Sequence, residues 1–175
     1  GSSIPFPTAS TLCAGSGGFT IAFDNLGNMW VADGGNHRIL RFPKQADGTI
    51  AKTANAVLGQ PNFASSNWNT SNAIYHPVGF VFDSVGNLYV AGSNEINATI
   101  HRFPAAQSLS NNAASTTSEI FKASPSNDSG FHRLKGMVKS KDGLGMWIEG
   151  VPSGWISNPD SRLSTMFSKL LFTNT

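Results

Sequence analysis

Residues 18–33 read Gly18-Phe-Thr-Ile-Ala-Phe-Asp-Asn-Leu-Gly-Asn-Met-Trp-Val-Ala-Asp33, and residues 77–92 read Pro77-Val-Gly-Phe-Val-Phe-Asp-Ser-Val-Gly-Asn-Leu-Tyr-Val-Ala-Gly92. The second stretch repeats the first at an offset of 59 positions, from Asp24 to Asp83. A motif that returns at a fixed interval of this length indicates stacked copies of one small structural unit. Within each copy, short apolar runs alternate with turns rich in Asp, Asn and Gly, which predicts an all-β fold of antiparallel strands.

Four such runs are expected in each of the two clear units. In the first unit they cover residues 19–24, 29–32, 38–42 and 53–58, and in the second 78–82, 87–91, 99–103 and 119–122. A weaker third unit begins with strands at 136–139 and 146–148. The later segment Ser161–Leu171 fits two alternatives. We favour two further strands, at 162–167 and 169–172, over a short helix.

The composition limits the possible functions. The chain has 175 residues, of which 13% are charged, and its formal net charge is +2. So small a charge argues against nucleic acid as a partner. No apolar run reaches about 18 residues, so we expect no membrane-spanning helix. Cys13 is the single cysteine, so it has no partner for an internal disulfide, and we interpret it as a small buried apolar residue.

The stretch Gly27-Asn-Met-Trp-Val-Ala-Asp-Gly-Gly-Asn-His-Arg-Ile-Leu-Arg-Phe42 resembles an NHL repeat. Leu58-Gly-Gln-Pro-Asn-Phe63 also resembles a linker of long bacterial members of that family. The resemblance implies a β-propeller in which each repeat forms one four-stranded antiparallel blade. We therefore expect a single domain over residues 1–175 with about three blades. Blade one covers residues 19–63, blade two 77–123, and a degenerate blade three 134–175.

Three blades do not complete a propeller, since closed rings have about 4–8 blades. A half-ring would leave two apolar flanks exposed, and large exposed apolar faces mark interfaces. We expect closure by self-association first, for example as a six-bladed dimer with a two-fold axis. A piece of a longer propeller and an open filament are the second and third alternatives. The segment Ile4–Ala9 is expected to add an edge strand to a neighbouring blade.

Asp33 and Arg38 flank one predicted hairpin, where a carboxylate and a guanidinium can form a hydrogen-bonded ion pair. In the second unit the matching residues are Gly92 and Thr99, so both partners are absent together. Loss of one partner alone would leave a charge unpaired in a confined place. We therefore interpret Asp33 and Arg38 as a structural pair and not as catalytic residues.

Several other residues are candidates for a site. His76 and His132 each precede a predicted first strand, and first strands line the channel of a propeller, so both could bind a ligand or metal at the channel mouth. Asn94 and Glu95 lie in the hairpin where the two units differ most, and we predict them as binding residues. Asp24, Asp83 and Asp142 recur at the same turn, where a role in capping backbone amides explains each. No catalytic residues and no cofactor are predicted, and the identity of any metal stays open.

We therefore expect a non-enzymatic interaction or scaffold module: an NHL-type propeller that binds a protein, peptide or glycan and is completed by self-association. Two alternatives stay open. One is a metal-assisted lyase or hydrolase with a channel site; the resemblance implies this option because some NHL-type propellers are lyases that use a channel metal. The other is a structural subunit of a ring or filament. The low charge and the Gly-Gln-Pro segment favour an extracytoplasmic or secreted bacterial protein, with a cytoplasmic location as the alternative.

Overall fold

The described part of the chain forms three antiparallel β-sheets and almost no helix. The computed structural model describes residues 6–13, 19–67, 74–93, 98–104, 106, 118–123, 131–143, 145–152 and 166–171, and in several strands only the path of the backbone. Gly34–Asn36 forms one turn of 3-10 helix, and none of the described residues lies in an α-helix. The prediction of an all-β, antiparallel fold is confirmed. No helix in the described parts of the chain is long and apolar enough to cross a membrane.

Each sheet is built from strands that follow one another in the sequence. The first sheet contains β1 (Ile21–Phe23), β2 (Met29–Asp33), β3 (Arg38–Phe42) and β4 (Ala56–Leu58), paired in that order. The second contains β5 (Pro77–Phe82), β6 (Leu88–Ser93), β7 (Ala98–Phe103) and β8 (Ser118–Ala123), also in order. The third contains β9 (Phe131–Lys139), β10 (Gly145–Pro152) and β11 (Met166–Leu171), with β10 in the middle.

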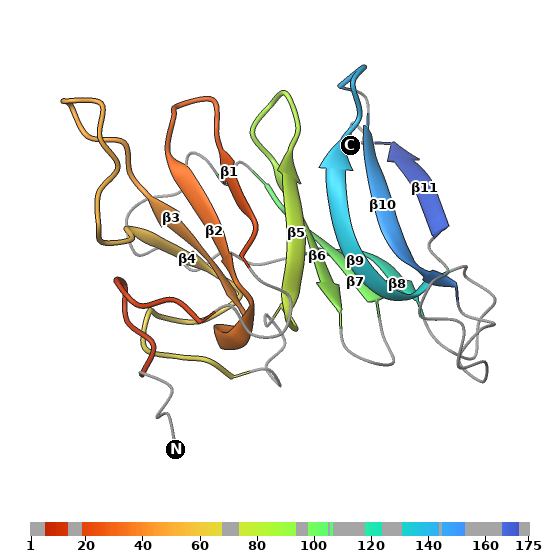
Figure 1. Cartoon of the computed structure of the whole chain (residues 1–175), viewed down its shortest axis with the longest axis horizontal. Coiled ribbons are helices and arrows are strands. Elements are labelled where there is room, and N and C mark those ends of the chain that lie inside the picture. The colour runs from red at the N-terminus through yellow and green to blue at the C-terminus, as the bar shows by residue number, and fades with distance from the viewer. Residues whose placement is uncertain are drawn as a thin grey trace.

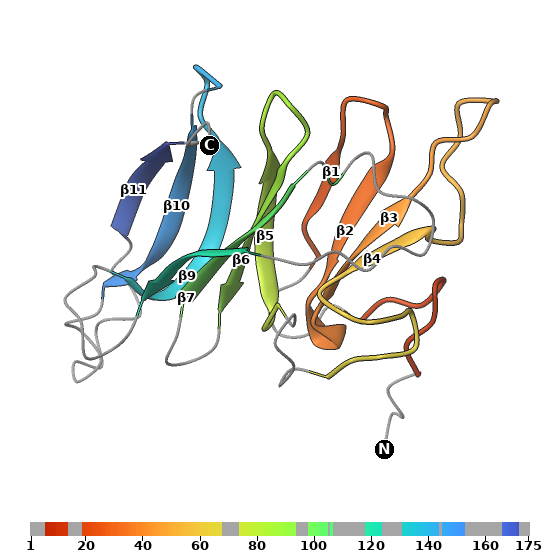
Figure 2. The ribbon, with the colours of Figure 1, turned by 180° about the vertical axis from the view of Figure 1, so that it is seen from behind.

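The three sheets lie side by side, and their sequence order is their order in space (Figure 1). The view from behind shows the same order, with the second sheet between the other two (Figure 2). Tight turns join the first two strands of each sheet at one common end, which is the upper end in Figure 1. The 3-10 turn Gly34–Asn36 lies at the opposite end.

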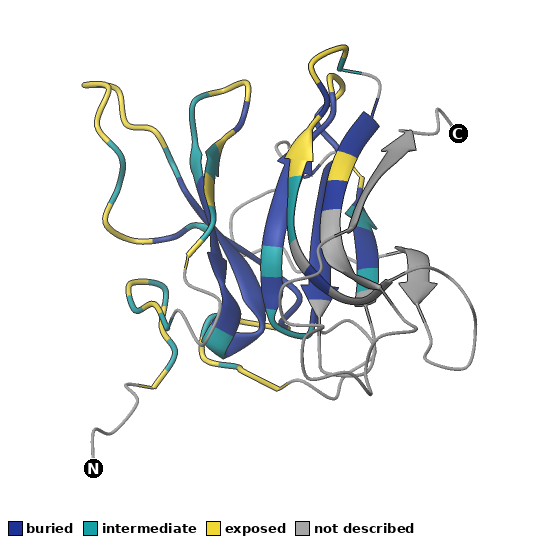
Figure 3. Ribbon diagram, turned by 45° about the vertical axis from the view of Figure 1, so that its right-hand side comes forward, coloured by how far each residue is buried: buried dark blue, intermediate teal, exposed yellow. Residues whose placement is uncertain are grey.

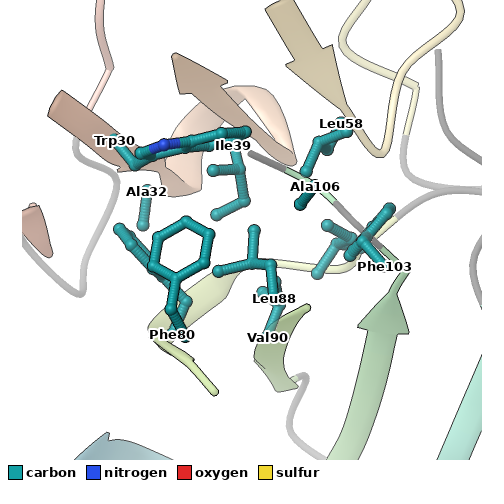
Figure 4. Close-up of a cluster of buried hydrophobic side chains, with 11 residues drawn as sticks. Trp30, Ala32, Ile39, Leu58, Phe80, Leu88, Val90, Phe103 and Ala106 are labelled. Carbon is teal, nitrogen blue, oxygen red and sulfur yellow. The ribbon is translucent and has the colours of Figure 1, made fainter. Parts of the chain in front are cut away.

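Neighbouring residues of a strand point to opposite faces, so each sheet has two faces. We call the face that carries Trp30, Tyr89 or Trp147 the forward face, and the opposite face the rear face. Two buried clusters fill the spaces between the sheets. In the first cluster, forward residues of the first sheet meet rear residues of the second (Figure 4); its main members are Trp30, Ala32, Ile39, Leu58, Phe80, Phe82, Leu88, Val90 and Phe103. In the second cluster, forward residues of the second sheet meet rear residues of the third; its members are Val81, Tyr89, Ala91, Ile100, Leu134, Met146 and Ile148.

The first strands of neighbouring sheets approach one another closely. The Thr20 hydroxyl, just before β1, donates a hydrogen bond of 3.0 Å to the carbonyl of Val78 in β5. Gly79 of β5 lies against β9, where a Cβ atom at this position would come within 3.0 Å of the backbone nitrogen of Met137. Glycine therefore permits a backbone approach between β5 and β9 that a larger residue would hinder.

Three details of the sequence-based prediction are corrected. Residues 166–171 form one continuous strand, β11, which excludes the helix alternative there and spans the break expected near Ser168. The first strand of the third unit begins at Phe131 instead of Gly136. Residues Phe6–Ala9 form no strand, so the part of Ile4–Ala9 that the structure describes adds no edge to a sheet.

The N-terminal segment Phe6–Cys13 instead crosses the rear face of the first sheet. The Ala54 amide donates a 2.8 Å hydrogen bond to the carbonyl of Ala9. Ala9 packs with Ile50 and Phe63 against a third buried cluster on that face, formed by Val31, Leu40, Phe42, Ala54 and Val57. Figure 3 shows that the buried residues lie mainly in the strands and that the described turns are mostly exposed or half-buried.

Candidate functional site

The recurring aspartates hold the turns between the first two strands. Oδ1 of Asp24 accepts hydrogen bonds from the backbone amides of Leu26 and Asn28, both at 2.9 Å. Oδ2 of Asp24 accepts hydrogen bonds from the side-chain Nδ2 of Asn28 and from the indole Nε1 of Trp30, both at 2.9 Å. Asp24 therefore caps the turn and fixes the largest ring of the first cluster. The capping role predicted for this residue is confirmed.

Asp83 repeats the arrangement in the second sheet. Its Oδ1 accepts from the amides of Val85 and Asn87, at 3.0 and 2.9 Å. Its Oδ2 accepts from the Asn87 side chain at 2.7 Å and from the Tyr89 hydroxyl at a long 3.4 Å. Burial, reinforced by the Asp83 charge, raises the pKa of Tyr89. The hydroxyl therefore stays protonated, as a donor to a carboxylate must.

In the third sheet a serine, and not the predicted Asp142, occupies this position. The Ser140 amide donates to the carbonyl of Gly145 at 2.9 Å, as Asp24 and Asp83 do to the carbonyl across their own turns. The Ser140 hydroxyl accepts from the Gly145 amide at 3.0 Å. Asp142 is exposed, and its Oδ1 accepts a 2.6 Å hydrogen bond from the Ser140 hydroxyl. The assignment of Asp142 to the recurring turn position was therefore wrong.

Asp33 and Arg38 form a fully buried ion pair next to the 3-10 turn. Arg38 Nε donates to Asp33 Oδ2 over 2.7 Å, and both side chains are 0% exposed. The other carboxylate oxygen, Oδ1, accepts from the backbone amide of Cys13 at 2.6 Å. Asn36 Nδ2 also donates to Oδ2, at 3.0 Å. The carboxylate thus joins its own hairpin to the N-terminal segment.

The Arg38 guanidinium extends this network to further parts of the chain. Its Nη2 donates to the carbonyls of Thr8 and Thr11, at 3.0 and 2.9 Å, and its Nη1 donates to the carbonyl of Phe63. Because every one of these acceptors belongs to the backbone or to Asp33, the pair has no arm directed at a ligand. The geometry is that of a structural connection between the hairpin, residues 8–13 and residue 63.

In the second sheet the position of the pair holds a neutral contact. Thr99 pairs with Gly92 in register, as Arg38 pairs with Asp33. The Thr99 hydroxyl donates to the Gly92 carbonyl at 3.3 Å. A Cβ atom at Gly92 would come within 3.0 Å of the Tyr75 carbonyl, so the chain before β5 lies directly over this position.

His76 lies just before β5 and belongs to a cluster with His37 and Tyr75. The ring centroids are 4.5 Å apart between the two histidines, 5.1 Å between His37 and Tyr75, and 4.7 Å between Tyr75 and His76. The His76 backbone amide donates to Nδ1 of His37 at 3.2 Å. The cluster therefore joins the end of the first sheet to the start of the second.

The backbone of this cluster is unusual. His37 and His76 have φ angles of 54° and 38°, and no other non-glycine residue that the structure describes has a positive φ. Such conformations are uncommon outside glycine, and they often mark functional positions. Hydrogen bonds hold both residues in this conformation. The His37 carbonyl accepts from Gln60 Nε2 at 3.1 Å, and the His76 amide donates to His37 Nδ1 as described above. Tyr75 and His76 are partly exposed, so the cluster presents a polar and aromatic surface at this end of the molecule.

The surroundings keep His37 neutral. Burial, and after it the neighbouring His76, lowers the pKa of His37 from 6.5 to about 4, while Asp33 opposes the shift. Since Nδ1 accepts the His76 amide, the single proton of the neutral ring lies on Nε2. Protonation of Nδ1 would break that hydrogen bond.

The remaining predicted site residues are His132, Asn94 and Glu95. His132 lies within β9, at an irregularity where Phe131 and Arg133 pair but His132 does not, so its predicted place before the strand was wrong. Its side chain, and the predicted binding residues Asn94 and Glu95, lie outside the described residues. Among the residues with described side chains, no three His, Cys, Asp or Glu groups could share a metal ion. Cys13 is free and only half buried, less than expected.

His37 and Tyr75 were missed in the sequence. The run Gly34-Gly-Asn-His37 was interpreted as a turn, which it is, but the position of its last ring could not be inferred from local pattern. One signal could have found it. The residues just before the first strand of a sheet must pass the end of a hairpin in the preceding sheet, so Tyr75 and His76 could be expected near His37.

A scan against protein-family models and a search of curated proteins found no match to this chain.

Proposed function

We propose that the chain is a non-enzymatic interaction module of the NHL-like β-propeller type, in which the three sheets are successive blades. The observation that carries this proposal is the repeated stacking. The forward face of one sheet meets the rear face of the next twice, through matching positions such as Trp30 and Tyr89. At both contacts between neighbouring sheets, the first strands of the two sheets approach each other, as strands around a common axis do.

The use of the recurring polar residues supports a binding role over catalysis. The described hydrogen bonds of Asp24, Asp83, Asp33 and Arg38 all go to backbone groups or to neighbouring side chains of the same sheet. The cluster of His37, Tyr75 and His76 differs, because two of its residues, Tyr75 and His76, are partly exposed. Tyr75 and His76 are therefore the residues that we expect to contact a protein, peptide or glycan.

The test is a binding screen with peptide and glycan arrays, followed by affinity measurements on variants. We expect Tyr75→Ala and His76→Ala each to weaken the best ligand at least about 10-fold, the range of one lost buried contact. Thr49→Ala is the matched control, since Thr49 lies in the exposed loop between β3 and β4 at the other end of the sheet. Equal binding by all variants would place the ligand elsewhere. Turnover of any screened substrate that His76→Ala abolishes would make the protein an enzyme.

A further inference from the structure

The repeat allows the same position to be compared with and without a neighbouring sheet. Phe80 and Phe82 on the rear face of the second sheet are 3% and 8% exposed, because the first sheet covers them. Their counterparts in the first sheet, Ile21 and Phe23, are 55% and 60% exposed. Both pairs occupy the first strand of a sheet and hold the same register against the second strand. The rear face of β1 is therefore a contact surface without its partner.

The structure also shows what kind of surface covers such a position. Trp30, on the forward face of the first sheet, meets Phe82 edge to face with ring centroids 5.4 Å apart. Aromatic pairs prefer this arrangement, which adds to the gain from apolar burial. The surface that fits Phe23 is thus a forward face with a large ring at the position of Trp30.

The chain exposes one such face itself. Trp147, at the position of Trp30 and Tyr89, is 43% exposed, and Val138, its register partner on β9, is 61% exposed. The matching pair in the second sheet, Tyr89 and Val81, is buried against the third sheet. The forward face of the third sheet therefore lacks a partner in the same way as the rear face of β1.

We propose that the Ile21/Phe23 face of one molecule binds the Val138/Trp147 face of a second copy of the chain, head to tail. The proposal rests on the blade-like stacking of the proposed function and names the partner that continues it. When each molecule makes this contact through both of its faces, both exposed apolar sets are covered, whereas a contact between two rear faces would leave Trp147 in solvent.

The contact is limited to the half of the rear face nearest β1. The other half, which includes Leu40 and Val57, is already buried under Ala9 and Phe63 of the same chain. The second copy therefore meets β1 and leaves the N-terminal segment in place.

The decisive experiment is directed cross-linking between two single-cysteine proteins. In a Cys13→Ala background, one protein carries Ile21→Cys and the other, labelled with nitrogen-15, carries Val138→Cys. Both keep Phe23 and Trp147. A short bismaleimide is added to the mixture and to each protein alone, and denaturing mass spectrometry identifies the products. We expect the mixed 21–138 species to exceed each symmetric species at least 10-fold.

Light scattering supplies a second measurement on the wild-type chain, whose mass is 18.5 kDa. We expect a multiple of that mass, which Phe23→Asp and Trp147→Asp reduce to one chain. Leu26→Asp and Val85→Asp are matched controls, because these exposed residues sit at the same turn position in two sheets, away from both end faces. They should leave the mass unchanged.

Two results would overturn the proposal. One is a wild-type protein that stays at 18.5 kDa at high concentration, and the other is predominant 21–21 or 138–138 cross-links. Neither affects the binding screen at Tyr75 and His76, so a monomer that still binds a ligand there would keep the proposed function and lose only this inference. If the aspartate variants fail to fold, the cross-linking result alone decides.

Discussion

At the scale of single residues, Asp33 and Arg38 bury two opposite charges side by side. A buried guanidinium is tolerated only where its charge and all its donors are matched, because removal of either charge from water is costly. Here one carboxylate and three backbone carbonyls provide the match. The pair therefore makes the folded state dependent on residues that are far apart in the sequence.

Replacement of Asp33 tests this dependence. Asp33→Asn keeps the size of the side chain and leaves the Arg38 charge unpaired, so we expect a loss of about 3–5 kcal/mol in the free energy of unfolding. Urea denaturation followed by circular dichroism measures it. The double variant Asp33→Asn, Arg38→Met should lose much less than the sum of the two single losses, since the two groups act together. Additive losses would show that the charges do not interact.

His37 predicts a dependence of stability on pH. Its pKa is about 4 in the folded protein, against 6.5 for an unperturbed histidine. Between these values the unfolded chain binds a proton that the folded chain does not, so stability falls as the pH falls. The free energy of unfolding is therefore highest above about pH 6.5 and falls until about pH 4, by an amount on the order of 2–3 kcal/mol from this residue.

Urea denaturation at a series of pH values between 4 and 7 measures this effect. His76 and Asp33 are the neighbouring titratable groups that shift the pKa of His37, so both must be intact in the comparison. The control is His37→Asn, because asparagine tolerates a positive φ and does not titrate. The variant should show a flatter profile over this range. An unchanged profile would assign the pH dependence to other groups.

At the scale of turns and strands, the prediction concerns the aspartates. Asp83→Ala removes the acceptor of two backbone amides and of the Tyr89 hydroxyl, so we expect a loss of about 2–3 kcal/mol. Asp142→Ala, at the residue that the sequence aligns with Asp83, should cost less than about 1 kcal/mol, since Ser140 holds that turn. Thermal unfolding compares the two. Equal losses would contradict the assignment of Ser140 to the turn position.

The elements themselves were largely predictable. Seven strands of the first two sheets lie within a residue or two of the segments inferred from apolar runs and turn residues, because each hairpin is local in sequence. Ser140 was not predictable, since the third turn has one more residue between its ends and the recurring aspartate pattern drew the alignment to Asp142. The hydrogen bonds of Arg38 to the carbonyls of Thr8 and Phe63 were also not predictable, because no local sequence pattern specifies a contact between distant loops.

At the scale of the whole molecule, the N-terminal segment acts as a cover. Removal of residues 1–13 would expose the apolar cluster around Leu40 and Val57 and leave two donors of Arg38 and one oxygen of Asp33 unpaired. We expect a loss of several kcal/mol and increased binding of an apolar dye, measured by fluorescence and urea denaturation. Phe6→Ser is the control, since this side chain is almost fully exposed and should change neither quantity. A deletion variant as stable as the full chain would contradict this role.

The stacking of the sheets also has a consequence for how the molecule opens. The second sheet is covered on both faces by neighbours, whereas the first and third each have one neighbour among the sheets. In such a one-dimensional array, local opening is least costly at the two ends. In a single chain without a bound second copy, the amides of β5, β6 and β7 should therefore exchange their hydrogens with solvent most slowly, and those of β1 faster than those of β5. The middle sheet would then be the last cooperative unit to open, even though the clearest copy of the motif belongs to the first.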